Sequence, residues 1–235
     1  LLVDGTVSGQ ADKTGGSGAT VTAGAFMQIS DSRLSANRFA GLAIVGVGTT
    51  LEASRLLVDS TLPQEGNETA GYGVYVADGA LAVLKASRVS SNRSTGIFSE
   101  GGFVSALGVL VDHSLPDLQG NDGQGVRVTG AASMATSLES CAIVMNRGAG
   151  LLVSGGSAQV IGSVVTETAP SRVQMGSDSG TFADGLVWSG NGALLVERSL
   201  VVRNERAGIL IDSPNPAIVR RCAVTGSGFG LVVQG

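Results

Sequence analysis

Residues 184–211, DGLVWSGNGALLVERSLVVRNERAGILI, contain one complete copy of the unit that repeats through this chain. A glycine opens a short apolar strand, GLVW, and a second apolar run, ALLV, follows a turn at residues 190–192. After a third run and a polar turn at residues 203–206, the glycine-led strand returns as GILI. Three strand-like runs leave no room for the crossover helix that usually joins parallel strands. The chain is therefore expected to coil, as the solenoids with short sequence repeats do.

The leading glycine can be followed along the whole sequence. It opens nine strand-like segments, at Gly18, Gly41, Gly73, Gly96, Gly125, Gly150, Gly185, Gly208 and Gly230. Successive glycines from Gly41 in every second segment are 55, 54 and 58 residues apart, and those from Gly18 are 55, 52 and 60 apart. Short coils thus alternate with long ones, and the true repeat is a pair of coils.

The strand residues alternate as half-buried strands do. In GVYV and GVRV the first and third residues after the glycine are predicted to face the core, and Tyr75 and Arg127 are predicted to face outward. In the short coils the outward positions are apolar and form an interrupted stripe of Ala43, Phe98, Leu152, Leu210 and Val232. We expect the long loops to cover this stripe, and the alternative is contact with a partner.

The short coils share an asparagine turn four residues before the leading glycine. Its members are Asn37, Asn92, Asn146 and Asn204. Asparagine tolerates left-handed backbone and bonds the local main chain, so we interpret the position as a structural turn that can stack into an asparagine ladder. A ligand site is the less favoured interpretation.

The long coils carry their extra residues at one point of the pattern, in segments 4–17, 60–72, 113–124 and 167–184. The loops are therefore predicted to project from one edge, where repeat proteins often bind partners. They carry the carboxylates of Asp4, Asp12, Glu65, Glu68, Asp117, Asp122, Asp178 and Asp184. Such a row is compatible with a Ca²⁺ site or with acid–base chemistry on sugars, although solvated acidic loops explain it more simply.

Five residues are the candidates for catalysis if the chain is an enzyme. They are Asp59, Asp112, His113, Glu167 and Asp184. His113 follows Asp112 and has the side chain of a general base, but its counterpart in the related loop is Ser60. The sequence has no GxSxG motif, no His/Cys metal cluster and no P-loop.

Composition narrows the function classes. The net charge of −4 argues against a nucleic-acid binder, and no apolar run reaches the roughly 20 residues that span a bilayer. Cys141 and Cys222 occupy equivalent positions three coils apart, about 14 Å at the spacing of neighbouring strands, so we expect two free, buried thiols in a ladder with Ser32, Ser54, Ser87, Ser163 and Ser199. The chain starts and stops in mid-pattern, which suggests a section of a larger protein.

The repeats ALLVERSLVVRNERAGILI and LVDSTLP…GYGVYV resemble those of right-handed parallel β-helix proteins of the pectate-lyase-like type. More narrowly, they are similar to repeats in large predicted surface proteins of myxobacteria. The resemblance implies an all-β, single-stranded right-handed parallel β-helix of about nine coils, forming one domain over residues 1–235. It also implies an extracellular or cell-surface location and polysaccharide as the class of ligand.

Two hypotheses for function follow. The first is a non-catalytic extracellular rod that acts as a spacer or adhesive module and binds glycans or other surface partners along its loop edge. The second is a polysaccharide lyase, hydrolase or epimerase. The catalytic signatures of such enzymes do not carry over to this sequence, because it has no D-D with G-H-G and no D-P-H-E. This absence favours the rod.

Overall fold

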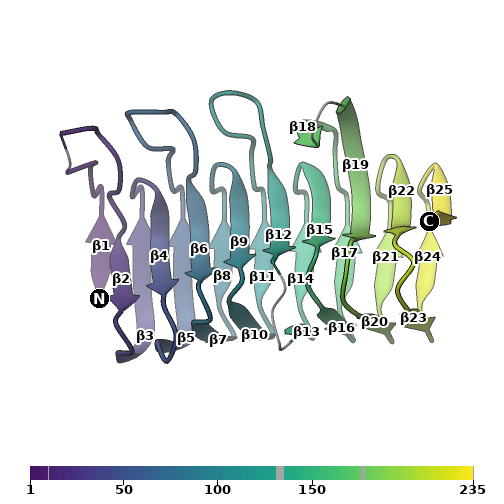
Figure 1. The fold of residues 1–235 in the computed structure, drawn as a ribbon, viewed down its shortest axis with the longest axis horizontal. Helices are drawn as coiled ribbons and strands as arrows, with labels where there is room; N and C mark the ends of the chain where they lie inside the picture. Colours follow the sequence, from purple (N-terminus) through teal and green to yellow (C-terminus); the bar gives the residue numbers. More distant parts are fainter. Residues whose placement is uncertain (10, 131–134, 176–177, 235) are drawn as a thin grey trace.

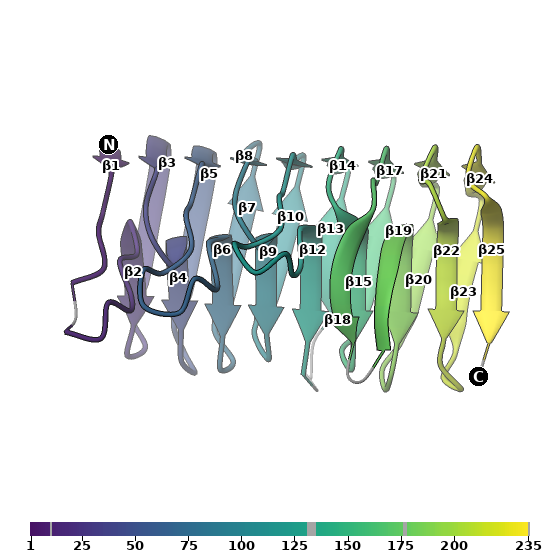
Figure 2. The same ribbon diagram turned by 90° about the horizontal axis from the view of Figure 1, so that it is seen from above.

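The computed structural model describes residues 1–9, 11–130, 135–175 and 178–234, without the side chains of residues 172–181. Every regular element in these ranges is a β-strand, and the strands form two sheets. Figure 1 shows strands of successive coils side by side along the long axis, and Figure 2 shows the two termini at opposite ends. This all-β, parallel arrangement is compatible with a β-helix-like solenoid.

The ten-stranded sheet holds the glycine-led strands. Its order is β2 (Ala19–Thr22), β4 (Ala40–Val45), β6 (Tyr72–Ala77), β9 (Thr95–Glu100), β12 (Gln124–Thr129), β15 (Gly148–Ser154), β19 (Asp178–Ser189), β22 (Ala207–Asp212) and β25 (Phe229–Gln234), with β18 (Ser171–Met175) antiparallel to β19. All other pairs in this sheet are parallel. Eight of the nine leading glycines lie within these strands, and Gly18 directly precedes β2.

The fifteen-stranded sheet has two arms that meet at two long strands, β3 (Phe26–Ser35) and β5 (Thr50–Asp59). The lower arm consists of β7 (Leu81–Lys85), β10 (Phe103–Leu107), β13 (Thr136–Glu139), β16 (Ala158–Ile161), β20 (Leu194–Glu197) and β23 (Ala217–Arg220). The upper arm consists of β8 (Arg88–Ser90), β11 (Leu110–Asp112), β14 (Ala142–Val144), β17 (Val164–Thr166), β21 (Leu200–Val202) and β24 (Ala223–Thr225), and β1 (Leu2–Asp4) pairs with β3. The chain visits the three rows in turn, so each coil contributes one strand to each.

The core lies between the sheets and is aliphatic. Val74, Val76, Val126 and Val128 are at most 1% exposed, which confirms their predicted orientation, while Tyr75 and Arg127 are on the outer face. One continuous cluster, made mostly of Val, Leu, Ile and Ala side chains and including Trp188 and Cys141, runs through the coils. Burial of this apolar surface, at roughly 25 cal/mol per Å², is the main stabilising term of the fold.

The leading glycines are required by close packing and not by unusual backbone angles. A Cβ atom on any one of the eight from Gly18 to Gly208 would lie 2.5–2.9 Å from the carbonyl oxygen of the next leading glycine. None of the nine has a positive φ. The column therefore marks where successive coils approach too closely for any side chain.

The asparagine turns are fully buried, and their hydrogen bonds differ from the predicted ladder. Each Asn Oδ1 accepts the backbone N–H of a hydroxyl residue one coil earlier, as in Thr61 N to Asn92 Oδ1 at 3.0 Å. The other three pairs are Thr6 with Asn37, Ser114 with Asn146, and Thr168 with Asn204. Asparagines recur only in every second coil, so the layer between them holds Thr or Ser. The stacking of asparagine on asparagine was therefore a wrong prediction, whereas the structural role is supported.

A second ladder contains the cysteines. Cys141 and Cys222 are both free, and each Sγ donates to carbonyl oxygens, as Ser163 and Ser199 do at the same position. Cys141 is buried, and burial raises the pKa of its thiol. Cys222 is only half-buried, so the expectation of two buried thiols is correct for Cys141 alone. Ser54 is not in the ladder, because strand register places Leu56 opposite Ser32.

Candidate functional site

The long loops lie together at one edge of the molecule, at the top of Figure 1. We number them loop 1 (residues 5–18), loop 2 (60–71), loop 3 (113–123) and loop 4 (167–170). Loops 1 and 2 are joined by Gly66 N to Lys13 O at 3.1 Å, and loops 2 and 3 by Gln119 Nε2 to Asn67 O at 3.0 Å. The predicted common edge is therefore present, and loops 1, 2 and 3 are connected to one another.

The short coils hold the long loops in place. Arg38 Nη1 donates to Pro63 O at 3.0 Å, and Arg93 Nη1 donates to Pro116 O at 3.4 Å. These prolines end the sequence V-D-x-x-L-P, which occurs at residues 58–63 and again at residues 111–116. The asparagine before each of these arginines bonds to the earlier long coil. Each of these two asparagine turns therefore connects the long coils on either side of it.

The loop carboxylates do not share a common partner, and those with a partner bond to groups close to them. Asp12 and Asp117 accept backbone N–H groups of their own loops, and Glu65 pairs with Arg38 at 3.5 Å. Asp4 ends β1, Glu68 is exposed, and the side chain of Asp178 lies outside the described residues. In the described part of the chain, no three His, Cys, Asp or Glu side chains come together as metal ligands would. Calcium binding stays a prediction of the sequence.

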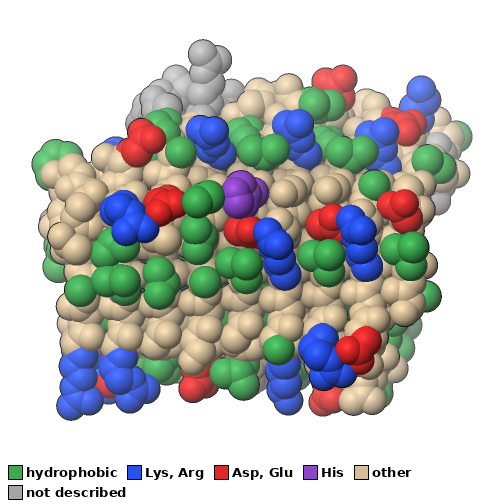
Figure 3. All heavy atoms as spheres, turned by 180° about the vertical axis from the view of Figure 1, so that it is seen from behind, with side chains coloured by type: hydrophobic (Ala, Val, Ile, Leu, Met, Phe, Trp, Pro, Cys, Tyr) green, Lys and Arg blue, Asp and Glu red, His purple; other side chains and the backbone are tan. Residues whose placement is uncertain are grey.

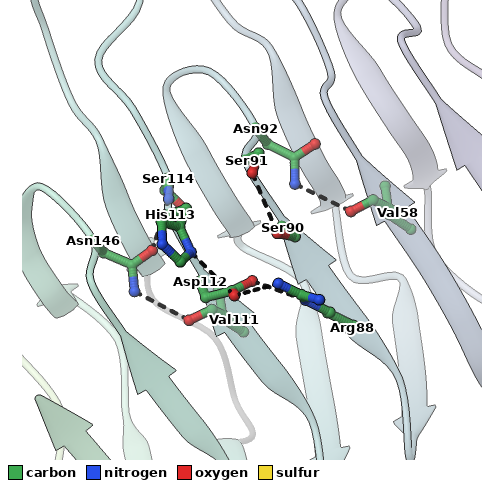
Figure 4. A network of polar contacts seen from close by, with 10 residues as sticks. All are labelled: Val58, Arg88, Ser90, Ser91, Asn92, Val111, Asp112, His113, Ser114 and Asn146. Carbon is green, nitrogen blue, oxygen red and sulfur yellow. Dashed lines mark hydrogen bonds and ion pairs between the residues drawn. The ribbon is translucent and has the colours of Figure 1, made fainter.

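Three of the five catalytic candidates lie on the outer face of the upper arm. Arg88 bonds both carboxylate oxygens of Asp112, at 3.2 and 2.6 Å, and His113 Nδ1 lies 3.1 Å from Asp112 Oδ2 (Figure 4). Asp59 is held in the same way by Arg33, at 3.0 and 2.7 Å. Figure 3 shows the histidine among alternating basic and acidic side chains on this face. The repeated Arg–Asp geometry is that of ion pairs between neighbouring coils.

His113 and Glu167 each directly follow an upper-arm strand, at the first residue of the turn that leaves it. Each has a positive φ, 56° and 58°, as Ser60 does at 58°, and each directly precedes the buried hydroxyl residue of its corner. Glu167 is paired with Arg203 at 2.5 Å. The side chains at this corner position point to solvent, and the backbone angle recurs from coil to coil, so it does not single out an active site.

Asp184 does not belong to the loop edge. It lies in β19 in the other sheet, is fully buried, and pairs with Arg206. Its Oδ1 also accepts the backbone N–H of Ala207 at 3.0 Å. The structure therefore separates Asp184 from the other four candidates and gives it a role in joining two coils.

Replacement of Asp112 by Asn is expected to lower the free energy of unfolding by about 1 kcal/mol at pH 7, because a charge-assisted bidentate pair is lost but Arg88 is half-exposed. Burial by itself raises the pKa of Asp112; hydrogen bonds from Arg88, Ser90 and His113 lower it by more, so this pKa is below its usual value. The contribution is thus present above the unfolded-state pKa and is lost as pH falls through the folded-state pKa.

Urea denaturation at pH 7 and pH 2.5 measures this effect. The difference between wild type and Asp112→Asn should be present at pH 7 and smaller at pH 2.5. Asp31→Asn is the matched control, since Asp31 pairs bidentately with Arg55 but is 61% exposed, and it should change stability much less than Asp112→Asn does. An equal difference at both pH values would contradict the assignment.

An aromatic cluster lies on the outer face of the ten-stranded sheet beside loops 2 and 3. It consists of Phe39, Tyr72, Tyr75 and Phe98, whose ring centroids are 5.1–5.9 Å apart in the described contacts. Phe98 is buried, and the other three rings are half-buried. The guanidinium of Arg127 lies 5.1 Å from the Phe98 centroid. Neighbouring side chains thus cover Phe98, where we had expected the long loops to do so.

Polar groups surround this cluster. Tyr75 donates its hydroxyl to Glu100 at 2.6 Å, and Asp122 of loop 3 accepts from Arg127 at 3.0 Å and from Ser94 at 2.8 Å. Burial raises the pKa of Tyr72 to about 12, with a contribution from Asp122. Burial and Glu100 raise the pKa of Tyr75 too. Both phenols therefore stay neutral at physiological pH and can donate or accept hydrogen bonds.

The sequence alone did not reveal this cluster. Tyr72 and Phe39 stand outside the GxYx strand pattern, and the separation of Phe39 from Phe98 along the chain hides their proximity. The sequence offered one indication of an aromatic cluster, which is that four of its few aromatic residues fall within residues 39–98. Only the coil register places them in one group.

The remainder of the outward row is apolar. Leu152, Val187 and Leu210 follow Arg127 along the sheet and form, with Ala149 and Val232, a small cluster separate from the core. The predicted stripe is interrupted by Tyr75 and Arg127, as expected, and all its members except Val232 are buried.

Comparison with known proteins found no matching family profile, no matching curated protein and no matching solved structure. In the described residues, no helix has the length and hydrophobicity needed to cross a membrane.

Proposed function

We propose that this chain is a section of a right-handed parallel β-helix rod that acts outside the cell as a spacer or adhesive module. In this proposal it binds neutral glycans on the aromatic cluster beside its loop edge. The observation that carries the proposal is the group of four packed rings, three of them half-exposed, on the outer face of a sheet.

The architecture supports the rod. Two parallel sheets, three strand rows and the glycine column are what stacked coils of one chain require. Each coil buries its apolar residues against its neighbours, so the rod can be lengthened without a new core. Repeats of this kind suit a spacer, because length follows directly from the number of coils.

The chemistry of the cluster supports a glycan ligand. Aromatic faces combine apolar area with a polar edge, and sugar rings offer matching C–H faces and hydroxyl groups. Among the side chains that the structure describes, Glu100 and Asp122 lie at the cluster together with Arg127, so these groups give it an acidic balance. A neutral sugar is therefore favoured over an anionic one.

The state of the carboxylates supports binding over turnover. Asp59, Asp112 and Glu167 are each paired with an arginine, and Asp184 is buried in an ion pair. General acids and bases in glycosidases work as a facing pair about 5–10 Å apart across the bond they cleave. In Asp59, Asp112 and Asp184 an arginine bonds both carboxylate oxygens, which are the atoms that would have to exchange a proton with a substrate.

Replacement of Tyr72 by Ala is expected to weaken glycan binding about tenfold, which corresponds to about 1.4 kcal/mol and is within reach of one lost ring contact. The measurement is calorimetric titration with neutral hexasaccharides of β-1,4-glucan and β-1,4-mannan, with oligogalacturonate as the anionic comparison. Products are analysed in the same samples.

Phe26→Ala is the matched control, because Phe26 is an exposed aromatic residue, 64% accessible, on the other sheet. It should leave binding unchanged. Equal losses in both variants, or no binding by the wild type to any neutral glycan, would refute the assignment to the cluster. Cleavage or epimerisation of any of these oligosaccharides would contradict the non-catalytic rod and favour the enzyme hypothesis.

A further inference from the structure

Loop 2 carries a modification motif at its tip. Residues 65–69 read Glu-Gly-Asn-Glu-Thr, so Asn67 begins an N-x-T sequence in which x is not proline. This is the acceptor pattern for attachment of a glycan to an asparagine amide. Glu65 adds an acidic residue two positions before the asparagine, which bacterial oligosaccharyltransferases additionally select.

The local geometry presents the Asn67 amide to solvent. Asn67 is exposed, and its Oδ1 accepts the backbone N–H of Thr69 at 3.1 Å. Within the described part of the chain, no hydrogen bond engages its Nδ2. The bond to Oδ1 orients the amide through its oxygen and leaves the nitrogen that must react accessible.

The loop tip is held from both sides. Gly66 N donates to Lys13 O of loop 1 at 3.1 Å, and Gln119 of loop 3 donates to Asn67 O at 3.0 Å. These contacts use only main-chain atoms of loop 2. A glycan on Nδ2 would therefore break none of them.

The same chain contains a second N-x-[ST] sequence, but its asparagine is buried in the folded structure. Asn92-Arg93-Ser94 matches the pattern. However, Asn92 is fully buried, its Oδ1 accepts from Thr61 N, and its Nδ2 donates to Val58 O at 3.3 Å. It also has Ser90 where Asn67 has Glu65. The two sites share the tripeptide and differ in access.

We propose that Asn67 is an N-glycosylation site and that Asn92 is not. The donor is a glycan linked through pyrophosphate to a lipid. Asn67 Nδ2 bonds to the anomeric carbon as the C1–O bond breaks; the lipid pyrophosphate leaves with the bonding electrons, and one amide proton goes to a base of the transferase. In the cell the reaction rests on the extracellular location proposed above, because the transferase acts on exported chains.

The test is a reconstituted reaction, which does not depend on export. The folded chain is incubated with a purified bacterial oligosaccharyltransferase and its lipid-linked glycan, and the product is analysed by intact mass and peptide mapping. One glycan on Asn67 is expected, with none on Asn92. Asn67→Gln should abolish the mass shift, and Glu65→Gln should reduce modification at least about tenfold.

A peptide of residues 62–72 is assayed in parallel. Modification of this peptide but not of the folded chain would refute the proposal, because the fold would then be shown to close the site. If neither the peptide nor the folded chain is modified, the sequence around Asn67 is not an acceptor and the proposal is wrong. A glycan on Asn92 would refute the argument from burial. Glycan binding at the aromatic cluster is measured on unmodified protein, so its outcome is independent.

Discussion

Replacing Gly96 with alanine is expected to lower the free energy of unfolding by about 3 kcal/mol, the upper part of the usual range for an overpacked core. The new Cβ would lie 2.5 Å from Val111 Cγ1 and 2.6 Å from the carbonyl oxygen of Gly125. Neither neighbour can move freely, because one is in the core and the other is main chain in the next coil. The strain must therefore separate two coils. Urea denaturation followed by circular dichroism measures the change.

Gly108→Ala is the matched control for this prediction. Gly108 has a positive φ of 63°, and a Cβ built on it meets nothing within 4 Å. The substitution should cost only the local backbone strain, about 1 kcal/mol. If Gly108→Ala were the more damaging of the two, the glycine column would be a matter of backbone conformation, and the close-packing explanation would be wrong.

Replacing Asn92 with alanine should cost about 2–4 kcal/mol. The side chain bonds two main-chain groups, Thr61 N–H and Val58 C=O, and its loss leaves Thr61 N–H without the Asn92 acceptor and removes one donor to Val58 C=O. Each unsatisfied buried group costs about 1–3 kcal/mol. Because Thr61 lies near the start of loop 2, amide hydrogen exchange should also accelerate at Thr61 and its neighbours more than elsewhere.

Asn67→Ala serves as the comparison for that variant. Asn67 is exposed at the loop tip, and within the described part of the chain its side chain hydrogen-bonds only to Thr69. The substitution should change stability by less than about 0.5 kcal/mol. Similar losses for the two asparagines would mean that the buried corner does not carry the stability assigned to it.

Much of the fold could be predicted because every coil must meet the same physical requirements. A strand must alternate, a corner must satisfy buried main-chain groups, and a close approach excludes side chains. The glycines from Gly18 to Gly230 and the valines around Tyr75 therefore marked strand positions correctly. The asparagine corners were likewise recognisable, because the same residue type returned at one place in every second coil.

The candidate site was less predictable, because a site depends on register between coils. Leu56, rather than Ser54, lies opposite Ser32, since the coil lengths shift the pairing by two residues from the apparent sequence match. Asp184 was grouped with the loops because it follows an insertion, yet it lies in β19 in the buried pair with Arg206. An insertion's residues can thus return to the sheet before the next leading glycine.

The sequence by itself determined the coil repeat, the alternation of short and long coils, the inward and outward strand positions and the common edge of the loops. These features are local or periodic, so one chain segment contains all the information. Only the tertiary structure decided that Thr and Ser complete the asparagine corners, that arginines occupy the candidate carboxylates and that Phe39, Tyr72, Tyr75 and Phe98 form one cluster. Those contacts join different coils, and their partners are set by strand register and side-chain packing, which no single repeat specifies.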